Sequence, residues 1–304
     1  MSIGNLFSQV LTLFIIMGVG VIARKVGIIT REYGKKMSEL LIYITAPAMI
    51  IISMNFKYSQ EMLKNAGLVL IIAFAVHFVS IALGFLVYSR FEPKTRRIAI
   101  FATAFSNCQF LGFPIMRAIF GQEGEFYASI YLIAFTVLIW TVGVMILTGK
   151  KDIRSALKVL TNPAIIAIVI GMIVFIFSLT IPAPLYKALD FVGSMTVPLA
   201  MLFIGSQLAE IKLADILSGF KVYMVAFMRL LFIPLALLGV LRLLGITGIA
   251  ATSAIVLAGM PTAANAAIFA EMFTGEAKFA SRVVAISTLF CIASVPLVFM
   301  LASL

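Results

Sequence analysis

The sequence predicts an all-α polytopic membrane protein of ten transmembrane helices, arranged as a 5+5 inverted repeat in which helices 4 and 9 are broken and cross each other. Three observations predict this fold. First, 63% of the 304 residues are hydrophobic and only 12% are charged, which is too apolar for a soluble domain. Second, Lys and Arg gather in alternate loops between the apolar runs. Third, short strings recur in the same order in both halves of the chain.

The apolar runs place the predicted spans. About 20 helical residues cross the hydrocarbon core, because an α-helix rises ~1.5 Å per residue and the core is ~30 Å thick. The expected repeats are 1–149 and 162–304, joined by a basic cytoplasmic linker at 150–161. The spans are 5–23, 37–55, 65–89, 98–120, 126–148, 162–181, 187–208, 219–241, 249–272 and 280–303.

The basic residues set the orientation. If the N-terminus lies outside, 17 of the 23 Lys and Arg residues fall on the cytoplasmic side and five at the outer ends. The positive-inside rule therefore predicts a multi-pass protein of the cell membrane with both termini outside. Five spans per half give the second repeat the opposite orientation. These charges serve topology, so the net charge of +11 predicts no nucleic-acid partner.

Three landmarks recur between the halves at a nearly constant separation. Members of each pair lie between 147 and 152 residues apart, which favours an internal repeat over coincidence. Pro47 pairs with Pro198, the string Gly112-Phe113-Pro114 with Gly259-Met260-Pro261, and His77 with Arg229.

The two Gly-x-Pro strings predict where spans 4 and 9 break. Proline lacks an N–H and clashes with the carbonyl four residues earlier. Lipid cannot satisfy the backbone groups that a break frees, so it must line a cavity or be buried in protein. Matching breaks in two halves point to the substrate site of a transporter. The second half-helix at each break begins with a partial positive charge, which suits a carboxylate.

The residues around both breaks are therefore the predicted substrate-binding residues. The amides could equally cap the broken helix ends, and one amide can do both. The set is Asn107, Gln109, Gly112, Pro114, Pro261, Thr262 and Asn265.

Two ionisable residues lie inside spans and are candidates for charge compensation or coupling. Arg229 falls at the centre of span 8, where arginine costs about 2.5–3.5 kcal/mol on the insertion scale. Either a substrate anion or the carbonyl ends of a broken helix must offset that cost. His77 lies at the matching position of span 3 and is either hydrogen-bonded and neutral or a proton-coupling group.

No paired carboxylates, metal-ligand cluster, nucleophile–base pair or phosphate-binding loop is evident in the sequence. The sequence therefore predicts a protein that is not an enzyme and that binds no cofactor and no metal.

Three motifs carry a resemblance to a known family, and it covers nearly the full length. They are the stretch from Ser106 to Pro114, the stretch from Gly259 to Asn265, and Thr161-Asn162-Pro163. In these the chain resembles bacterial members of the auxin efflux carrier family, which includes the plant PIN-type carriers. The resemblance implies a scaffold of helices 1, 2, 6 and 7, a homodimer through that scaffold, and a transport domain that moves as an elevator. Bacterial relatives are associated with organic anions such as malate or malonate.

The expected function is secondary active transport of a small organic anion, a carboxylate, by alternating access at crossed helices 4 and 9. One alternative is a sodium-coupled symporter of the bile-acid type, against which the missing mid-span acids count. A second is a membrane sensor or channel without coupled transport. The expected partners are the small organic anion, the lipid bilayer and a second copy of the chain.

Overall fold

The computed structural model describes residues 3–149, 157, 159–210 and 219–304, and every regular element in them is helical. Most of the predicted linker at 150–161 lies outside the described residues. The α-helices of the first half are α1 (Ile3–Lys25), α2 (Arg31–Leu40), α3 (Ala46–Ser53), α4 (Gln60–Val87), α5 (Pro93–Ala104), α6 (Phe113–Leu138) and α7 (Val144–Thr148). Those of the second half are α9 (Pro163–Ile176), α10 (Ala183–Ser194), α11 (Thr196–Leu208), α13 (Phe220–Phe227), α14 (Ile233–Leu243), α15 (Ile249–Ala258), α16 (Ala266–Thr274) and α17 (Ala277–Ser303). The π-helical turns are η1 (Leu41–Thr45), η2 (Cys108–Gly112), η3 (Ile139–Gly143) and η4 (Met228–Phe232).

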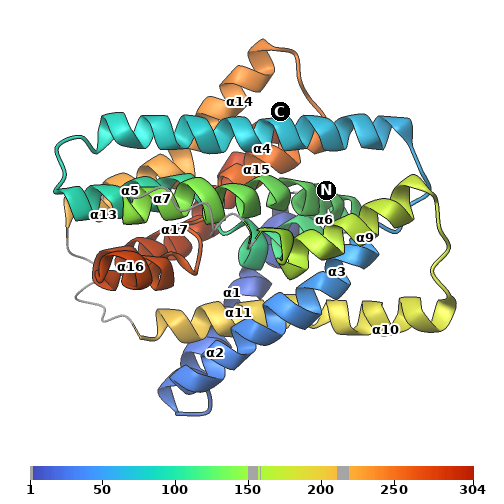
Figure 1. Ribbon diagram of the computed structural model, residues 1–304, viewed down its shortest axis with the longest axis horizontal. Helices are drawn as coiled ribbons and strands as arrows, with labels where there is room; N and C mark the ends of the chain where they lie inside the picture. The colour runs from blue at the N-terminus through green and yellow to red at the C-terminus, as the bar shows by residue number, and fades with distance from the viewer. Residues whose placement is uncertain (1–2, 150–156, 158, 211–218) are drawn as a thin grey trace.

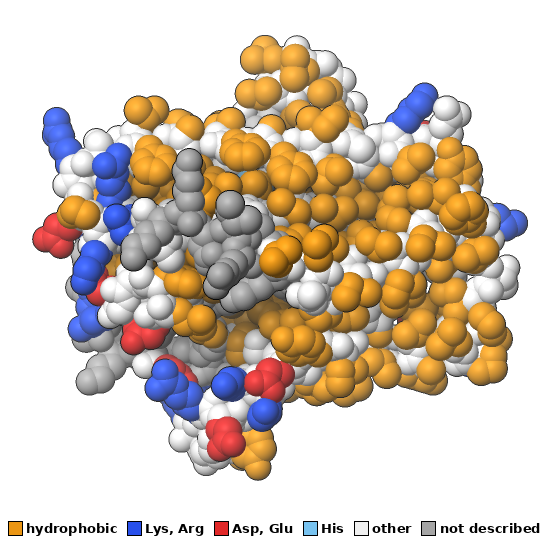
Figure 2. All heavy atoms as spheres, in the orientation of Figure 1, with side chains coloured by type: hydrophobic (Ala, Val, Ile, Leu, Met, Phe, Trp, Pro, Cys, Tyr) orange, Lys and Arg blue, Asp and Glu red, His pale blue; other side chains and the backbone are white. Residues whose placement is uncertain are grey.

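Helix α4 runs along one flank and α10 and α11 along the other, whereas α2 and α3 lie obliquely and α14 projects beyond α4 (Figure 1). Figure 2 shows apolar side chains over most of one face, with Lys and Arg gathered mainly at one end. Among the described residues, six helical stretches are long and apolar enough to cross a membrane, and α9 and α15 are shorter apolar helices. These features describe a multi-pass membrane protein. The six stretches are Arg31–Ser53, Gln60–Val87, Cys108–Thr148, Ala183–Leu208, Phe220–Leu243 and Ala277–Ser303.

Three of the π-helical turns end two residues before a proline. A proline in an α-helix clashes with the carbonyl four residues earlier, and a π turn moves that carbonyl out of register. Spans 2, 4 and 8 therefore continue through their prolines. The pairs are η1 with Pro47, η2 with Pro114 and η4 with Pro234.

The predicted break of span 4 at Gly112-Phe113-Pro114 is consequently misplaced. Helix α5 ends at Ala104, and the chain re-enters a helix at Cys108, so the break lies before the string. The cause is η2, in which Gly112 N–H donates to Asn107 O at 2.9 Å, five residues back. In span 9 the break does include Gly259 and Pro261, because no helix is described between Ala258 and Ala266.

The predicted loop between spans 4 and 5 is reduced to a sharp reversal inside α6. Gly121 has φ 62° and ψ −141°, and its neighbours on both sides are helical. A Cβ on Gly124 would stand 2.3 Å from the carbonyl oxygen of Met116. The two arms therefore fold back against each other, and Gly124 allows the close approach.

Candidate functional site

The two broken spans cross at their breaks and pair through the backbone. Ser106 and Thr262 form an isolated antiparallel bridge. Asn107 N–H donates to Pro261 O at 2.6 Å, and Ala263 N–H donates to Phe105 O at 3.0 Å. The crossing thus satisfies backbone groups that lipid could not satisfy.

Arg229 fills the crossing from η4 and is 1% exposed. Its Nη1 donates to Thr103 O at 2.7 Å and to Ala104 O at 3.2 Å, at the C-terminal end of α5. Its Nη2 donates to Ala258 O, and its Nε donates to Met260 O at 3.1 Å, at the end of α15. Within the described residues Arg229 forms no ion pair with a carboxylate. The guanidinium therefore joins the carbonyl ends of both first half-helices.

Asn107 caps the second half of span 4. Its side-chain Oδ1 accepts a hydrogen bond from Phe110 N–H at 3.2 Å. The residue is 2% exposed, and its Nδ2 has no hydrogen-bond partner. A buried donor without a partner is costly, so this N–H₂ group is available to an acceptor on a ligand.

The other predicted residues of the first half lie around η2. Gln109 is only partly buried, one residue inside the turn. Gly112 is buried, and a Cβ there would stand 2.8 Å from Leu257 Cδ2 of α15. Pro114 is buried in the first turn of α6. Gly112 thus permits the approach of α15, and Pro114 lies about two helical turns beyond the crossing.

Of the predicted residues of the second half, Pro261 and Thr262 form hydrogen bonds within the crossing, whereas Asn265 is more exposed. Pro261 supplies a carbonyl to the crossing, as described above. The Thr262 hydroxyl donates to Ala102 O at 2.9 Å, and Thr262 N–H donates to Ser287 Oγ at 3.1 Å. Asn265 begins α16 without a side-chain cap and is only partly buried. Of this set, Asn265 has the side chain best placed to meet a ligand.

His77 lies beside the crossing and is 1% exposed. Its Nδ1 is 2.6 Å from Ala73 O of its own helix, and its Nε2 has no hydrogen-bond partner. The ring packs against Phe105 and Tyr131, with centroids 5.6 Å away in each case. His77 therefore touches the break of span 4 through Phe105 rather than through a hydrogen bond.

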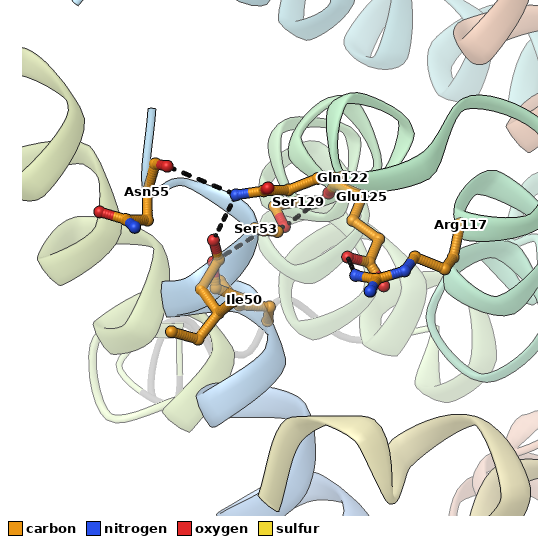
Figure 3. A network of polar contacts seen from close by, with 8 residues as sticks. Ile50, Ser53, Asn55, Arg117, Gln122, Glu125 and Ser129 are labelled. Carbon is orange, nitrogen blue, oxygen red and sulfur yellow. Dashed lines mark hydrogen bonds and ion pairs between the residues drawn. The ribbon is translucent and has the colours of Figure 1, made fainter. Parts of the chain in front are cut away.

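A second polar cluster, which the sequence analysis missed, lies where α6 reverses beside the end of α3 (Figure 3). Arg117 Nη1 donates to Glu125 Oε2 at 2.7 Å. Gln122 Nε2 donates to Ile52 O at 2.9 Å, and the hydroxyls of Ser53 and Ser129 are 3.2 Å apart. The Glu125 side chain is only 3% exposed. The available signal was the pair Gly121 and Gly124, which allows a reversal that folds Glu125 inward.

Comparison with known proteins decides the family. The model of the membrane transport protein family, to which the auxin efflux carriers belong, matches residues 5–156 and 150–299. The chain belongs to the auxin efflux carrier family. The family resemblance read from the crossing motifs is thereby confirmed.

Two archaeal relatives of this auxin efflux carrier family member are described as uncharacterized transporters. The one from Methanocaldococcus jannaschii is 26% identical over 292 residues, which cover 92% of this chain and 94% of the relative. The one from Methanothermobacter thermautotrophicus is 24% identical over 300 residues, covering 95% of both chains. The similarity extends over the whole membrane domain and includes both breaks.

Proposed function

We propose that this protein is a secondary active carrier for a small organic anion, a carboxylate, in the plasma membrane. Its ten spans form a 5+5 inverted repeat, with repeats at 1–149 and 162–304 and both termini outside. Substrate gains access alternately from either side at crossed helices 4 and 9, by elevator movement of a transport domain against a scaffold that forms a homodimer.

The charge balance at the crossing is the observation that carries the proposal. Each helix C-terminus is equivalent to roughly −0.5 elementary charge and each N-terminus to roughly +0.5. The ends of α5 and α15 together contribute about −1, which Arg229 offsets through its four carbonyl contacts. The starts of η2 and α16 then leave a total of about +1, which matches one carboxylate.

The donors at the crossing support an acceptor-rich ligand. Asn107 Nδ2 is buried without a partner. Gln109 and Asn265 are only partly buried, so the approach to the crossing lies on their side. The Thr262 hydroxyl is occupied by Ala102 O, and we therefore assign Thr262 to the framework.

The inverted repeat has structural support of its own. The breaks of spans 4 and 9 pair with each other and so lie at one depth. Gly20 of α1 and Gly205 of α11 allow a close crossing, since a Cβ on Gly205 would stand 2.0 Å from Met17 O. Helices 1 and 7 are scaffold members in the family arrangement, and this contact fits a rigid scaffold.

The test is uptake by proteoliposomes of radiolabelled monocarboxylates and dicarboxylates, with imposed proton or sodium gradients. The wild type should exchange at least one carboxylate. Asn107→Asp keeps the Oδ1 cap but replaces the free N–H₂ with an anionic oxygen, so carboxylate exchange should be lost while the protein remains folded. Loss of one hydrogen bond to a charged ligand costs about 1.5–3 kcal/mol, or roughly tenfold to hundredfold in affinity.

Asn65→Asp, on α4 away from the crossing, is the matched control and should exchange normally. Wild-type protein that exchanges none of the carboxylates would refute the proposal, as would Asn107→Asp protein with unchanged exchange.

A further inference from the structure

A cavity separate from the crossing, lined by both apolar and charged residues, lies between the reversal of α6 and helices α3 and α10. Its volume is about 140 Å³. Gln122 and the Ser53–Ser129 contact lie near Glu125 (Figure 3) but do not line the cavity. The lining residues are Met49, Ile52, Arg117, Glu125, Asp190, Gly193, Ser194 and Val197.

Glu125 is a buried carboxylate, and its ion-pair partner Arg117 is exposed to solvent. The Glu125 side chain is 3% exposed, whereas that of Arg117 is 51% exposed. Their 2.7 Å pair joins the two arms of the α6 reversal. Since the arginine extends to the surface, it can leave the pair without entering the core.

Asp190 is a second carboxylate that faces the same guanidinium, from α10. It lines the cavity with Arg117 and Glu125 and interacts electrostatically with both. Tyr186 of α10 also faces Arg117, while α3 contributes only Met49 and Ile52 to the cavity. Arg117 thus pairs with the buried Glu125 and shares the cavity with a second, less buried carboxylate on a separate helix.

We propose that Glu125 is the proton-binding site that couples transport to the proton gradient, with Arg117 moving between Glu125 and Asp190. This inference rests on the carrier function proposed above. When α6 shifts relative to α10, Arg117 pairs with Asp190 and leaves Glu125 without a cation. A hydronium ion from the outer water then protonates the Glu125 carboxylate and leaves as water. Protonation is favoured because a buried carboxylate without a cationic partner is costly as an anion. After the transport domain has moved to its inward-facing position, the return of Arg117 displaces the proton from Glu125 to the inner water, so one proton crosses the membrane per cycle.

The experiment compares two rates in proteoliposomes with radiolabelled malate. One is uptake driven by an inside-alkaline gradient of one pH unit, with the membrane potential clamped to zero by K⁺ and valinomycin. The other is exchange against internal unlabelled malate without a gradient. For one coupled proton, the wild type should accumulate malate up to about tenfold under the gradient.

Glu125→Gln mimics the protonated carboxylate. It should lower the ratio of gradient-driven uptake to exchange until it equals the ratio measured when no pH gradient is imposed. Asp190→Asn removes the second partner of Arg117 and should lower the same ratio, which keeps the test available if Glu125→Gln inserts poorly. Glu123→Gln changes a carboxylate in the same turn that does not line the cavity, and it should keep the wild-type ratio.

Wild-type malate uptake that does not respond to the pH gradient would overturn the coupling proposal, and so would a Glu125→Gln protein that keeps the full gradient response. Absence of exchange by the wild type for every carboxylate would instead refute the carrier function. The two failures are therefore distinguishable.

Discussion

Replacing Arg229 with leucine tests whether the crossing is held together by one side chain. Insertion energetics alone favour the variant, because leucine removes an arginine that costs about 2.5–3.5 kcal/mol at a helix centre. The hydrogen bonds of Arg229 predict instead that the leucine variant is less stable than the wild type. The guanidinium serves carbonyls of Thr103, Ala104, Ala258 and Met260. Each buried acceptor left without a partner costs about 1–3 kcal/mol, so four together cost roughly 4–12 kcal/mol.

That loss exceeds the gain in insertion and approaches the whole stability of about 5–15 kcal/mol that proteins have. We expect Arg229→Leu to lower the Tm of the detergent-purified protein by about 10 °C or more, measured by size-exclusion chromatography after heating. The Tm of Arg229→Lys should fall between those of the wild type and Arg229→Leu, because a single ammonium cannot span the carbonyls of α5 and α15 as a planar guanidinium does.

Arg242→Leu is the matched control. Arg242 lies in α14, one residue beyond the predicted end of span 8, and donates to a single carbonyl, Leu301 O, at an exposed position. Its replacement should change the Tm by a few degrees at most. If Arg229→Leu melted at the wild-type temperature, the guanidinium would not be holding the carbonyl ends, and the charge balance behind the anion site would have to be abandoned.

Three further outcomes test the topology, the reversal and the open end of the site. A cysteine at Lys57 should react with membrane-impermeant thiol reagents in intact cells and one at Lys94 only with permeant reagents, and the reverse labelling would invert the proposed orientation. Gly124→Ala should separate the arms of α6, because its Cβ would meet Met116 O at 2.3 Å, and should lower the Tm, whereas an unchanged Tm would mean that the arms are not closely packed. Asn265→Asp, at a position without a cap hydrogen bond, should weaken carboxylate exchange without lowering the Tm, and unchanged exchange would remove Asn265 from the site.

The sequence predicted the existence and pairing of the breaks better than their positions. Gly-x-Pro strings marked both broken spans, and in span 9 the break includes Pro261. In span 4 the marker misled, because the widened turn η2 accommodates Pro114 and the chain breaks earlier, at 105–107. Nothing in the local pattern distinguishes a proline after a π turn from a proline at a break. The distinction depends on the non-helical segment of span 9, since Asn107 N–H donates to Pro261 O.

Buried polar residues were predicted where they interrupt an apolar run and missed where they border a loop. Arg229 stood out in the middle of span 8, although its carbonyl partners are up to 126 residues away and no local pattern identifies them. Glu125 was missed because it falls at the expected start of span 5, where an acid is ordinary. Its burial follows from the tight reversal at Gly121, a tertiary feature that a single sequence encodes only as two closely spaced glycines.

The widened turn η4 connects a proline contact with the buried arginine, and together these contacts should make the crossing rigid. Pro234, two residues beyond η4, packs on the break of span 9, where a Cβ on Gly259 would stand 3.3 Å from Pro234 Cβ. Arg229, inside η4, bonds to the carbonyls on both sides of the crossing. One turn of span 8 therefore fixes both broken helices through a proline contact and a guanidinium. Since the broken spans are also paired by backbone hydrogen bonds, spans 4, 8 and 9 should move as one body. In the proposed transport cycle, movement is expected where this body contacts α3 and α11 rather than at the crossing.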